Sequence, residues 1–367
     1  MGARPVRVAM FSLGGTISML PQPGGGVAPL LSGAEVLAAV PGLEAARASG
    51  GAMEAARASG GAMEAARASG GAMDATGIAV EVHDFRRLAG SALSIEDVHL
   101  LAVEIRRRVA AGIDGVVVTQ GTDTIEETAY LLDLVYAGDA PLVVTGAMRN
   151  AAMAGADGPA NLLAAVRVAA SAEARGLGCL VVFADEVHAA RYVRKAHTTR
   201  ITAFVSYPGP IGYVVESAVR VALRPVRSQV VDGVDPGRRV ETAVVLATLG
   251  DGGALLRAAT AQVDGLVVAG FGAGHVPVPW VPILAESAAR IPVVLASRTG
   301  AGSVLADTYG FAGSESDLFS RGLISAGSLD AVKARLHLHL LLQAGVDWAG
   351  IDGALAIAGD RATPPEH

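Results

Sequence analysis

The chain has 367 residues, of which 51% are hydrophobic, so it can bury a large core and is long enough for two domains. Its 29 basic and 35 acidic residues give a net charge of −6, which leaves no basic excess to neutralise a phosphate backbone or an anionic membrane. We therefore expect neither nucleic acid nor a membrane as a partner, and the single cysteine excludes an intrachain disulfide framework.

From the N-terminal residues we expect no targeting signal. Residues 1–7 lead directly into an apolar run, without the longer apolar stretch and small-residue cleavage site of a secretory signal. No run reaches the roughly 20 apolar residues that a membrane-spanning helix needs. We therefore predict a cytoplasmic protein.

Short runs rich in β-branched residues alternate along the chain with segments of helical spacing. The predicted strands are residues 6–13, 115–119, 141–145, 179–183, 243–247, 265–269 and 292–296. The predicted helices include residues 94–111, 124–136, 159–172 and 329–344. This alternation predicts an α/β fold of two doubly wound domains with mainly parallel sheets, in which ligands bind at the carboxyl ends of the strands.

The alternation lapses over residues 214–241, which are polar and rich in arginine and proline. Such a composition suits an interdomain connection better than a core element. We therefore predict a larger N-terminal domain over 1–213, a linker over 214–241 and a smaller C-terminal domain over 242–367.

The sequence EAARASGGAM occurs three times without variation over residues 44–73. This period fits no solenoid class, because solenoid units have about 20 to 50 residues. Each unit favours a helix and then interrupts it with two glycines, each of which costs roughly 1 kcal/mol in a helix interior. We interpret residues 44–73 as a low-complexity insertion in the N-terminal domain, and the alternative is a partner-binding arm.

Two glycines and a threonine, Gly14, Gly15 and Thr16, follow the first predicted strand. The glycines let the backbone bend sharply and expose N–H groups, so that a substrate carbonyl could approach the Thr16 hydroxyl. Taken alone, a tight turn with a capping threonine is the simpler interpretation of this segment.

A polar cluster, TQGTDTIEET, follows the second predicted strand over residues 119–128. Thr122, Asp123 or Thr124 could cap the next helix, and Glu127 would complete a capping box with Thr124. The cluster has more hydroxyls and carboxylates than capping requires. A carboxylate here could bind a substrate ammonium, while the helix N-terminus could bind a carboxylate.

Further along, Asp157 and Pro159 mark the start of a helix. A lysine such as Lys195 is usually a solvated surface charge. If it is buried beside a carboxylate, it could instead accept a proton, because desolvation readily shifts the pKa of an ammonium group.

These motifs, in this order, resemble the successive signatures of bacterial L-asparaginases: GGTI at 14–17, TQGTDTIEETAY at 119–130, TGAMR at 145–149 and DGPANL at 157–162. The likeness continues through 195–199 and 209–213 to 334–336, and so covers nearly the whole chain outside the repeat. The resemblance implies two α/β domains and a homotetramer built from intimate dimers, with each active site near a subunit interface. It implies no metal and no organic cofactor.

The resemblance also implies a role for each candidate residue. The catalytic candidates are Thr16 as the nucleophile and the group Thr122, Asp123 and Lys195 beside it. The substrate-binding candidates are Gly15, Ser91, Thr122, Asp123, Ala147 and His275. Ser91 would hold the substrate α-carboxylate, Asp123 the α-ammonium, and the Ala147 carbonyl the side-chain amide. His275 stands where the family has an asparagine of the neighbouring subunit, and backbone amides around Gly15 and Thr122 are candidate oxyanion donors.

The sequence departs from the family at several positions. The family commonly has a tyrosine on the loop after the nucleophile, whereas none occurs between Thr16 and Ser91, and Val27 falls near its place. Tyr309 or a substrate group could replace it, so the base that activates the nucleophile stays open. Ala92 replaces the familiar glutamine after Ser91. An acidic residue expected near 301–309 is not obvious, and Glu315 is the candidate.

The predicted function is that of an amidohydrolase, which cleaves L-asparagine to L-aspartate and ammonia through a threonine acyl-enzyme, with glutamine as a lesser substrate. One alternative is the ammonia-generating subunit of a tRNA amidotransferase, but its additional N-terminal domain is not expected here because Thr16 lies near the start. The other alternative is a non-catalytic amino-acid sensor, which the missing tyrosine would suit.

Overall fold

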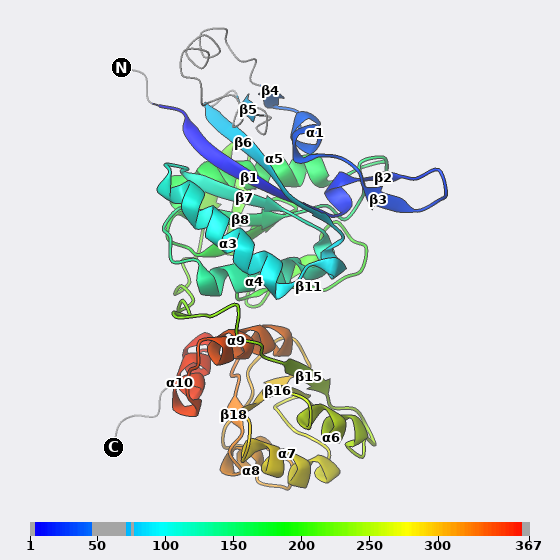
Figure 1. The fold of residues 1–367 in the computed structure, drawn as a ribbon, viewed down its shortest axis with the longest axis vertical. Helices are drawn as coiled ribbons and strands as arrows, with labels where there is room; N and C mark the ends of the chain where they lie inside the picture. The colour runs from blue at the N-terminus through cyan, green and yellow to red at the C-terminus, as the bar shows by residue number, and fades with distance from the viewer. Residues whose placement is uncertain (1–3, 46–70, 75–76, 362–367) are drawn as a thin grey trace. The chain divides into compact units, whose positions relative to one another are not determined.

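The computed structural model describes residues 4–45, 71–74 and 77–361 of the chain. Its contacts divide the chain into two units, Met1–Arg227 and Ser228–His367, each with its own sheet (Figure 1). Helices cover both sheets, so the predicted α/β fold is confirmed. The middle of the predicted insertion, residues 46–70, lies outside the described residues.

A ten-stranded sheet organises the described part of the first unit, in the order β14-β13-β10-β9-β8-β7-β1-β6-β5-β4. Its middle strands run parallel to one another: β9 (Cys179–Phe183), β8 (Leu142–Thr145), β7 (Gly115–Thr119), β1 (Val6–Gly14) and β6 (Ile78–Leu88). Antiparallel strands extend both sides: β10 (Glu186–Ala189), β13 (Gly212–Val215), β14 (Ala218–Val221), β5 (Gly71–Asp74) and β4 (Leu43–Ala45). Every residue of β7, β8 and β9 is buried, as in parallel strands that are covered on both faces.

Helices cover the two faces of this sheet (Figure 1). On one face α5 (Gly158–Ala170) packs against β1, β7, β8 and β9, and α1 (Gly33–Ala38) shares its apolar core. On the other, α4 (Ile125–Val135) packs against β8, β9 and α3 (Ile95–Ala110). Helix α3 begins with a capping box, in which the Ser94 hydroxyl accepts the Asp97 amide and the Asp97 carboxylate accepts the Ser94 amide.

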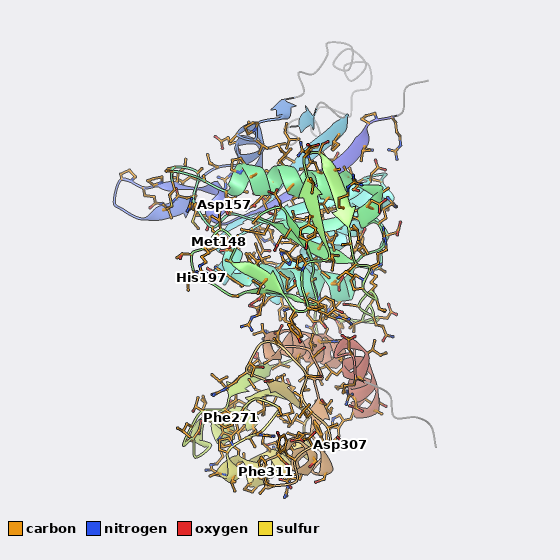
Figure 2. The ribbon with its side chains drawn as sticks, turned by 180° about the vertical axis from the view of Figure 1, so that it is seen from behind. Met148, Asp157, His197, Phe271, Asp307 and Phe311 are labelled. Atoms are coloured by element: carbon orange, nitrogen blue, oxygen red, sulfur yellow. The ribbon has the colours of Figure 1, made fainter. Side chains whose placement is uncertain are left out.

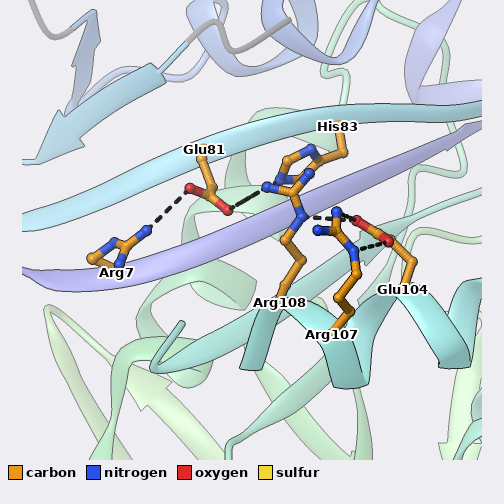
Figure 3. A network of polar contacts seen from close by, with 6 residues as sticks. All are labelled: Arg7, Glu81, His83, Glu104, Arg107 and Arg108. Atoms are coloured by element: carbon orange, nitrogen blue, oxygen red, sulfur yellow. Dashed lines mark hydrogen bonds and ion pairs between the residues drawn. The ribbon is translucent and has the colours of Figure 1, made fainter. Parts of the chain in front are cut away.

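A polar network connects α3 with the neighbouring strands (Figure 3). Glu81 of β6 lies 3.5 Å from Arg7 of β1 and 3.5 Å from Arg108 of α3, and its Oε1 lies 3.2 Å from the Nε2 of His83. Arg108 also donates to Glu104 at 2.8 Å. Because these side chains are partly exposed, each ion pair contributes only about 0–1 kcal/mol to stability.

Two short antiparallel pairs lie outside the main sheet of the first unit: β2 (Met19–Pro21) with β3 (Val27–Pro29), and β11 (Val193–Lys195) with β12 (Phe204–Ser206). The first pair follows Thr16 directly and includes Val27, which is exposed. The second pair carries Lys195 at the end of β11. Each pair therefore lies next to a candidate site residue, Thr16 for the first pair and Lys195 for the second.

The second unit has a smaller, entirely parallel sheet in the order β15-β16-β17-β18. Its strands are β15 (Thr242–Leu246), β16 (Gly265–Gly270), β17 (Val293–Ser297) and β18 (Ile324–Ser325). Its α-helices are α6 (Ala254–Thr260), α7 (Val281–Ala288), α8 (Glu315–Ser320), α9 (Ala331–Gln343) and α10 (Trp348–Ala358). Helix α9 packs against the first three strands, and the fully buried Trp280 lies in the core that α6 and α7 share with the sheet. No helix among the described residues is long and apolar enough to cross a membrane.

The first unit continues past the predicted domain boundary at residue 213. Strands β13 and β14 pair antiparallel from Gly212 with Val221 to Val215 with Ala218, and both belong to the sheet of the first unit. The predicted linker over 214–241 therefore begins too early. The alternation lapses there because two short strands follow one another without a helix between them, which marks a change in pairing and not the end of the unit.

We predict that stability depends on pH through two buried histidines, His188 on β10 and His337 on α9. Burial disfavours the imidazolium and lowers the pKa of each ring from 6.5 to about 4. Between these values the unfolded chain binds protons that the folded chain does not. The free energy of unfolding should therefore fall as the pH falls from about 6.5 to about 4, by on the order of 3 kcal/mol per ring over the whole window.

Urea unfolding of the wild type and of His188→Asn at pH 7.5, 6 and 5 tests this expectation. Asparagine can keep the hydrogen bond that links Nδ1 of His188 to Ser206 (2.9 Å) but does not titrate in this range. The variant should lose less stability than the wild type between pH 7.5 and 5. Parallel pH dependences of the two proteins would contradict the prediction.

Candidate active site

Three glycines at the carboxyl ends of three neighbouring parallel strands let their loops converge. Gly15 follows β1, Gly90 follows β6 and Gly121 follows β7. A Cβ on Gly15 would lie 2.0 Å from the Gly121 nitrogen, and a Cβ on Gly121 would lie 2.6 Å from the Gly90 nitrogen. Gly15 also has a φ of +82°, which side chains rarely adopt. Only glycine fits at this junction, which we call the glycine junction. The residue after each glycine therefore begins where the three loops are closest.

Those next residues are three of the predicted site residues. Thr16 begins the short helix η1 (Thr16–Ser18) and is half-buried, Ser91 is exposed in η2 (Gly90–Ala92), and Thr122 begins η3 (Thr122–Thr124) and is buried. The amide of Gly15 donates to the Leu88 carbonyl at 3.0 Å. The Gly15 amide is therefore already engaged with the backbone of the loop after β6.

Thr122, Asp123 and Lys195 are in direct contact. The Lys195 ammonium donates to Thr122 Oγ1 at 2.9 Å and to Asp123 Oδ1 at 2.8 Å. The Lys195 amide donates to Glu126 Oε2 of α4 at 2.8 Å. Because Thr122 accepts from the ammonium, its own hydroxyl proton is free to point elsewhere, for example toward a water or a substrate.

The ion pair between Lys195 and Asp123 lies at the boundary with solvent. The Asp123 side chain is 66% exposed, whereas that of Lys195 is 15% exposed. Ion pairs in such surroundings contribute only about 0–1 kcal/mol, so this pair alone cannot fix the lysine. The backbone contact to Glu126, which the sequence did not reveal, shares that role.

Two side chains at the start of α5 hold the loop after β8. Asp157 accepts the amides of Met148 (2.9 Å) and Arg149 (2.8 Å), and the side-chain amide of Asn161 donates to the Gly146 carbonyl at 3.0 Å (Figure 2). Ala147, within this loop, is fully buried. Asp157 does precede α5 as predicted, but its carboxylate binds the loop and does not cap the helix.

The predicted capping box at α4 is wrong. Thr124 occupies the N-cap position but makes no capping hydrogen bond. Its hydroxyl instead donates to the Gly90 carbonyl at 3.0 Å and accepts from the Gln120 side chain at 3.2 Å. Thr124 therefore joins the loop after β7 to the loop after β6, which strengthens the glycine junction.

A pocket of about 390 Å³ opens beside the ion pair, and its lining residues are Asp123, Lys195, Ala196, His197 and Thr198. This volume accommodates a small amino acid. Its wall offers a carboxylate, an ammonium, hydroxyl and imidazole groups, so it can bind a ligand that carries both charges. In the described part of the chain, no three His, Cys, Asp or Glu side chains converge as metal ligands.

The remaining predicted residue, His275, lies in the second unit, as does Tyr309. The Nε2 of His275 lies 3.1 Å from Glu315 Oε2, and its ring meets those of Tyr309 and Phe311 edge to face. Glu315 is fully buried, and its Oε1 accepts the amides of Thr308 and Tyr309. Burial alone would raise the pKa of Glu315, but these amides and His275 lower it below its ordinary value. Glu315 therefore braces this loop internally and is not free to bind a substrate.

The chain matches two family models along most of its length. Residues 7–227 match the model described as "Asparaginase, N-terminal", and residues 241–355 match "Glutaminase/Asparaginase C-terminal domain". The probable L-asparaginase of Deinococcus radiodurans is 37% identical over 350 residues, which cover 94% of this chain and 95% of that protein. L-asparaginase 2 of Escherichia coli is 37% identical over 62% of this chain and 66% of its own length.

The fold also resembles a solved structure. The crystal structure of a probable cytoplasmic L-asparaginase from Campylobacter jejuni superposes with a TM-score of 0.74 at 28% sequence identity. The match covers 95% of this chain and 98% of that one.

The glycine junction predicts a large effect of Gly15→Ala. The new methyl group would lie against the Gly121 backbone, and alanine would be strained at φ +82°, so we expect a loss of about 2–5 kcal/mol in the free energy of unfolding of the first unit. Gly24→Ala is the matched control, because a Cβ there meets nothing within 4 Å. Urea unfolding measures both variants, and equal stabilities would refute the proposed close approach.

Proposed function

Since the chain belongs to the asparaginase family, we propose that it is an amidohydrolase that converts L-asparagine to L-aspartate and ammonia with Thr16 as the nucleophile. The observation that carries the proposal is the contact of Lys195 with both Thr122 and Asp123 beside the pocket. Thr122 and Asp123 follow β7, and Lys195 reaches them from β11, 73 residues from Thr122 in the sequence. Together the three offer a hydroxyl, a carboxylate and an ammonium to an amino-acid substrate.

The substrate would be held by its two charged groups. The exposed carboxylate of Asp123 binds the α-ammonium, the exposed hydroxyl of Ser91 binds the α-carboxylate, and the carbonyl of Ala147 accepts from the side-chain amide. Asp123 keeps one oxygen on Lys195 and offers the other to the substrate. This arrangement selects a small α-amino acid with an amide at its other end.

The reaction would then proceed in two steps. Thr16 Oγ1 attacks the amide carbon, the C–N bond breaks, and ammonia leaves with the proton that the threonine gives up. A water next to Thr122 then attacks the acyl carbon, and the ester bond to Thr16 Oγ1 breaks. The proton of the water passes through the Thr122 hydroxyl to Thr16 Oγ1, while the Lys195 ammonium holds Thr122 in place. Among the described residues the Thr16 hydroxyl makes no hydrogen bond, so nothing in that part of the chain competes with the substrate for it. The scheme requires no metal and no organic cofactor.

Thr16→Ala should lower kcat for ammonia release from L-asparagine by roughly 10⁴-fold or more, because the nucleophile is removed while the pocket persists. Thr16→Ser should keep measurable activity. Mass spectrometry after treatment with a diazo substrate analogue should find the adduct on Thr16. An adduct on Thr122 alone would reverse the roles of the two threonines, and binding of asparagine by the wild type without turnover would favour an amino-acid sensor.

We also propose a cytoplasmic homotetramer made of two intimate dimers, in which His275 contributes to the site of a neighbouring subunit. The likeness to the family along both units supports this assembly. Analytical ultracentrifugation should give four chain masses. If His275 acts across subunits, a mixed oligomer of Thr16→Ala and His275→Ala chains contains some sites with both residues intact. Such mixed oligomers, made by co-expression, should be more active than either variant alone. Activity no higher than that of the two variants would contradict the shared site.

A further inference from the structure

The turn that follows Lys195 is organised around one side chain, His197. After β11 the chain turns back through residues 196–203 to β12, and the Ala196 amide closes this turn by donating to the Ala203 carbonyl at 2.8 Å. Inside the turn, Nδ1 of His197 accepts the amides of Thr199 at 3.1 Å and Arg200 at 3.2 Å. The imidazole nitrogen therefore serves as the hydrogen-bond acceptor for the Thr199 and Arg200 amides, a role that a backbone carbonyl has in a regular helix or strand.

These contacts fix the tautomer of the ring. A neutral imidazole accepts on one nitrogen and carries its hydrogen on the other, so acceptance at Nδ1 places the hydrogen on Nε2. His197 also lines the pocket beside Asp123, Lys195 and Thr198. The same side chain thus braces the turn and forms part of the pocket wall.

The position of the Lys195 ammonium depends on its backbone. The Lys195 amide is held by Glu126, but the chain on its carbonyl side enters the turn that His197 braces. Because the Asp123 carboxylate of the ion pair is 66% exposed, the pair contributes only about 0–1 kcal/mol and does not hold the lysine by itself. A loosened turn would let the ammonium leave Thr122 Oγ1 and Asp123 Oδ1 for solvent.

The geometry points to His197 as a positioning residue for the reaction, which rests on the proposed function. It acts through Nδ1, which holds the turn at 197–200 so that the Lys195 ammonium stays bonded to Thr122 and Asp123.

Three variants distinguish the roles of the two ring nitrogens. His197→Asn keeps an acceptor near the place of Nδ1, His197→Gln places its amide near Nε2 and lacks that acceptor, and His197→Ala removes both.

The first measurement is steady-state kinetics with L-asparagine. His197→Ala and His197→Gln should lower kcat about 10–100-fold through misplacement of the lysine, with KM changed by less than about threefold, whereas His197→Asn should stay within about threefold of the wild type. Activity in the Gln variant with loss in the Asn variant would show that Nε2 acts and would overturn the assignment. Equal activity of all three variants would overturn it as well.

The second measurement does not depend on catalysis. The chain has two lysines, Lys195 and Lys333, and Lys333 is 1% exposed and paired with Asp330 at 2.6 Å. Limited acetylation followed by mass spectrometry should show faster modification of Lys195 in the Ala and Gln variants and wild-type rates in the Asn variant. Unchanged Lys195 reactivity would refute the brace.

Lys333, in α9 of the second unit, is the internal reference for the extent of acetylation, and urea unfolding shows whether a variant keeps the first unit folded. Should the Ala variant unfold, the comparison of Asn with Gln still decides, since both keep a polar side chain of similar size. If the wild type releases no ammonia from asparagine, the proposed function fails, but the acetylation rates still test whether His197 positions Lys195.

Discussion

The candidate site depends on the close approach of three backbones at Gly15, Gly90 and Gly121. Strands in a sheet lie about 4.8 Å apart, and the side chains of their loops normally separate the chains further where the strands end. Here a Cβ would meet a neighbouring backbone nitrogen at 2.0 Å or 2.6 Å, so the loops stay as close as the strands they leave. The glycines therefore bring together the loops that carry Thr16, Ser91 and Thr122, although β1, β6 and β7 are widely separated in the sequence.

Polar side chains near helix starts complete this convergence by joining different loops. Thr124 binds the Gly90 carbonyl, Asp157 binds two amides of the loop after β8, and Glu126 binds the amide of Lys195. Loop amides have no ladder partner, and each needs an acceptor when water is excluded. The same residue types that could cap their own helices serve these more distant groups instead. Hydrogen bonds to the backbone, more than the exposed ion pair, therefore set the site geometry.

How far the sequence predicts this structure differs between its parts. Continuous apolar runs such as residues 115–119 and 179–183 become strands with the predicted bounds, because only buried parallel strands accept them. Strand β6 was not predicted, although the alternation of its buried and half-buried residues is typical of a strand with one covered face. Strands β10, β13 and β14 were not predicted because each has only four residues. The contact of Lys195 with Thr122 spans 73 residues, and only the family resemblance pointed to it. The local sequence could not show whether the side chains of Thr124 and Asp157 would cap the helices they precede or bind the backbone of another loop.

The tandem repeat begins and ends inside a described pair of strands, with Glu44 opposite Met73 and Ala45 opposite Ala72. Every unit begins with Glu-Ala and ends with Ala-Met, so any whole number of units would offer the same residues to β4 and β5. The cost of closing a longer connection grows only slowly, by about 0.6 kcal/mol for each doubling of its length. Replication slippage could therefore add or delete whole copies in this gene without shifting the strand register, which makes the segment a place where chain length can vary between lineages while the fold is inherited intact.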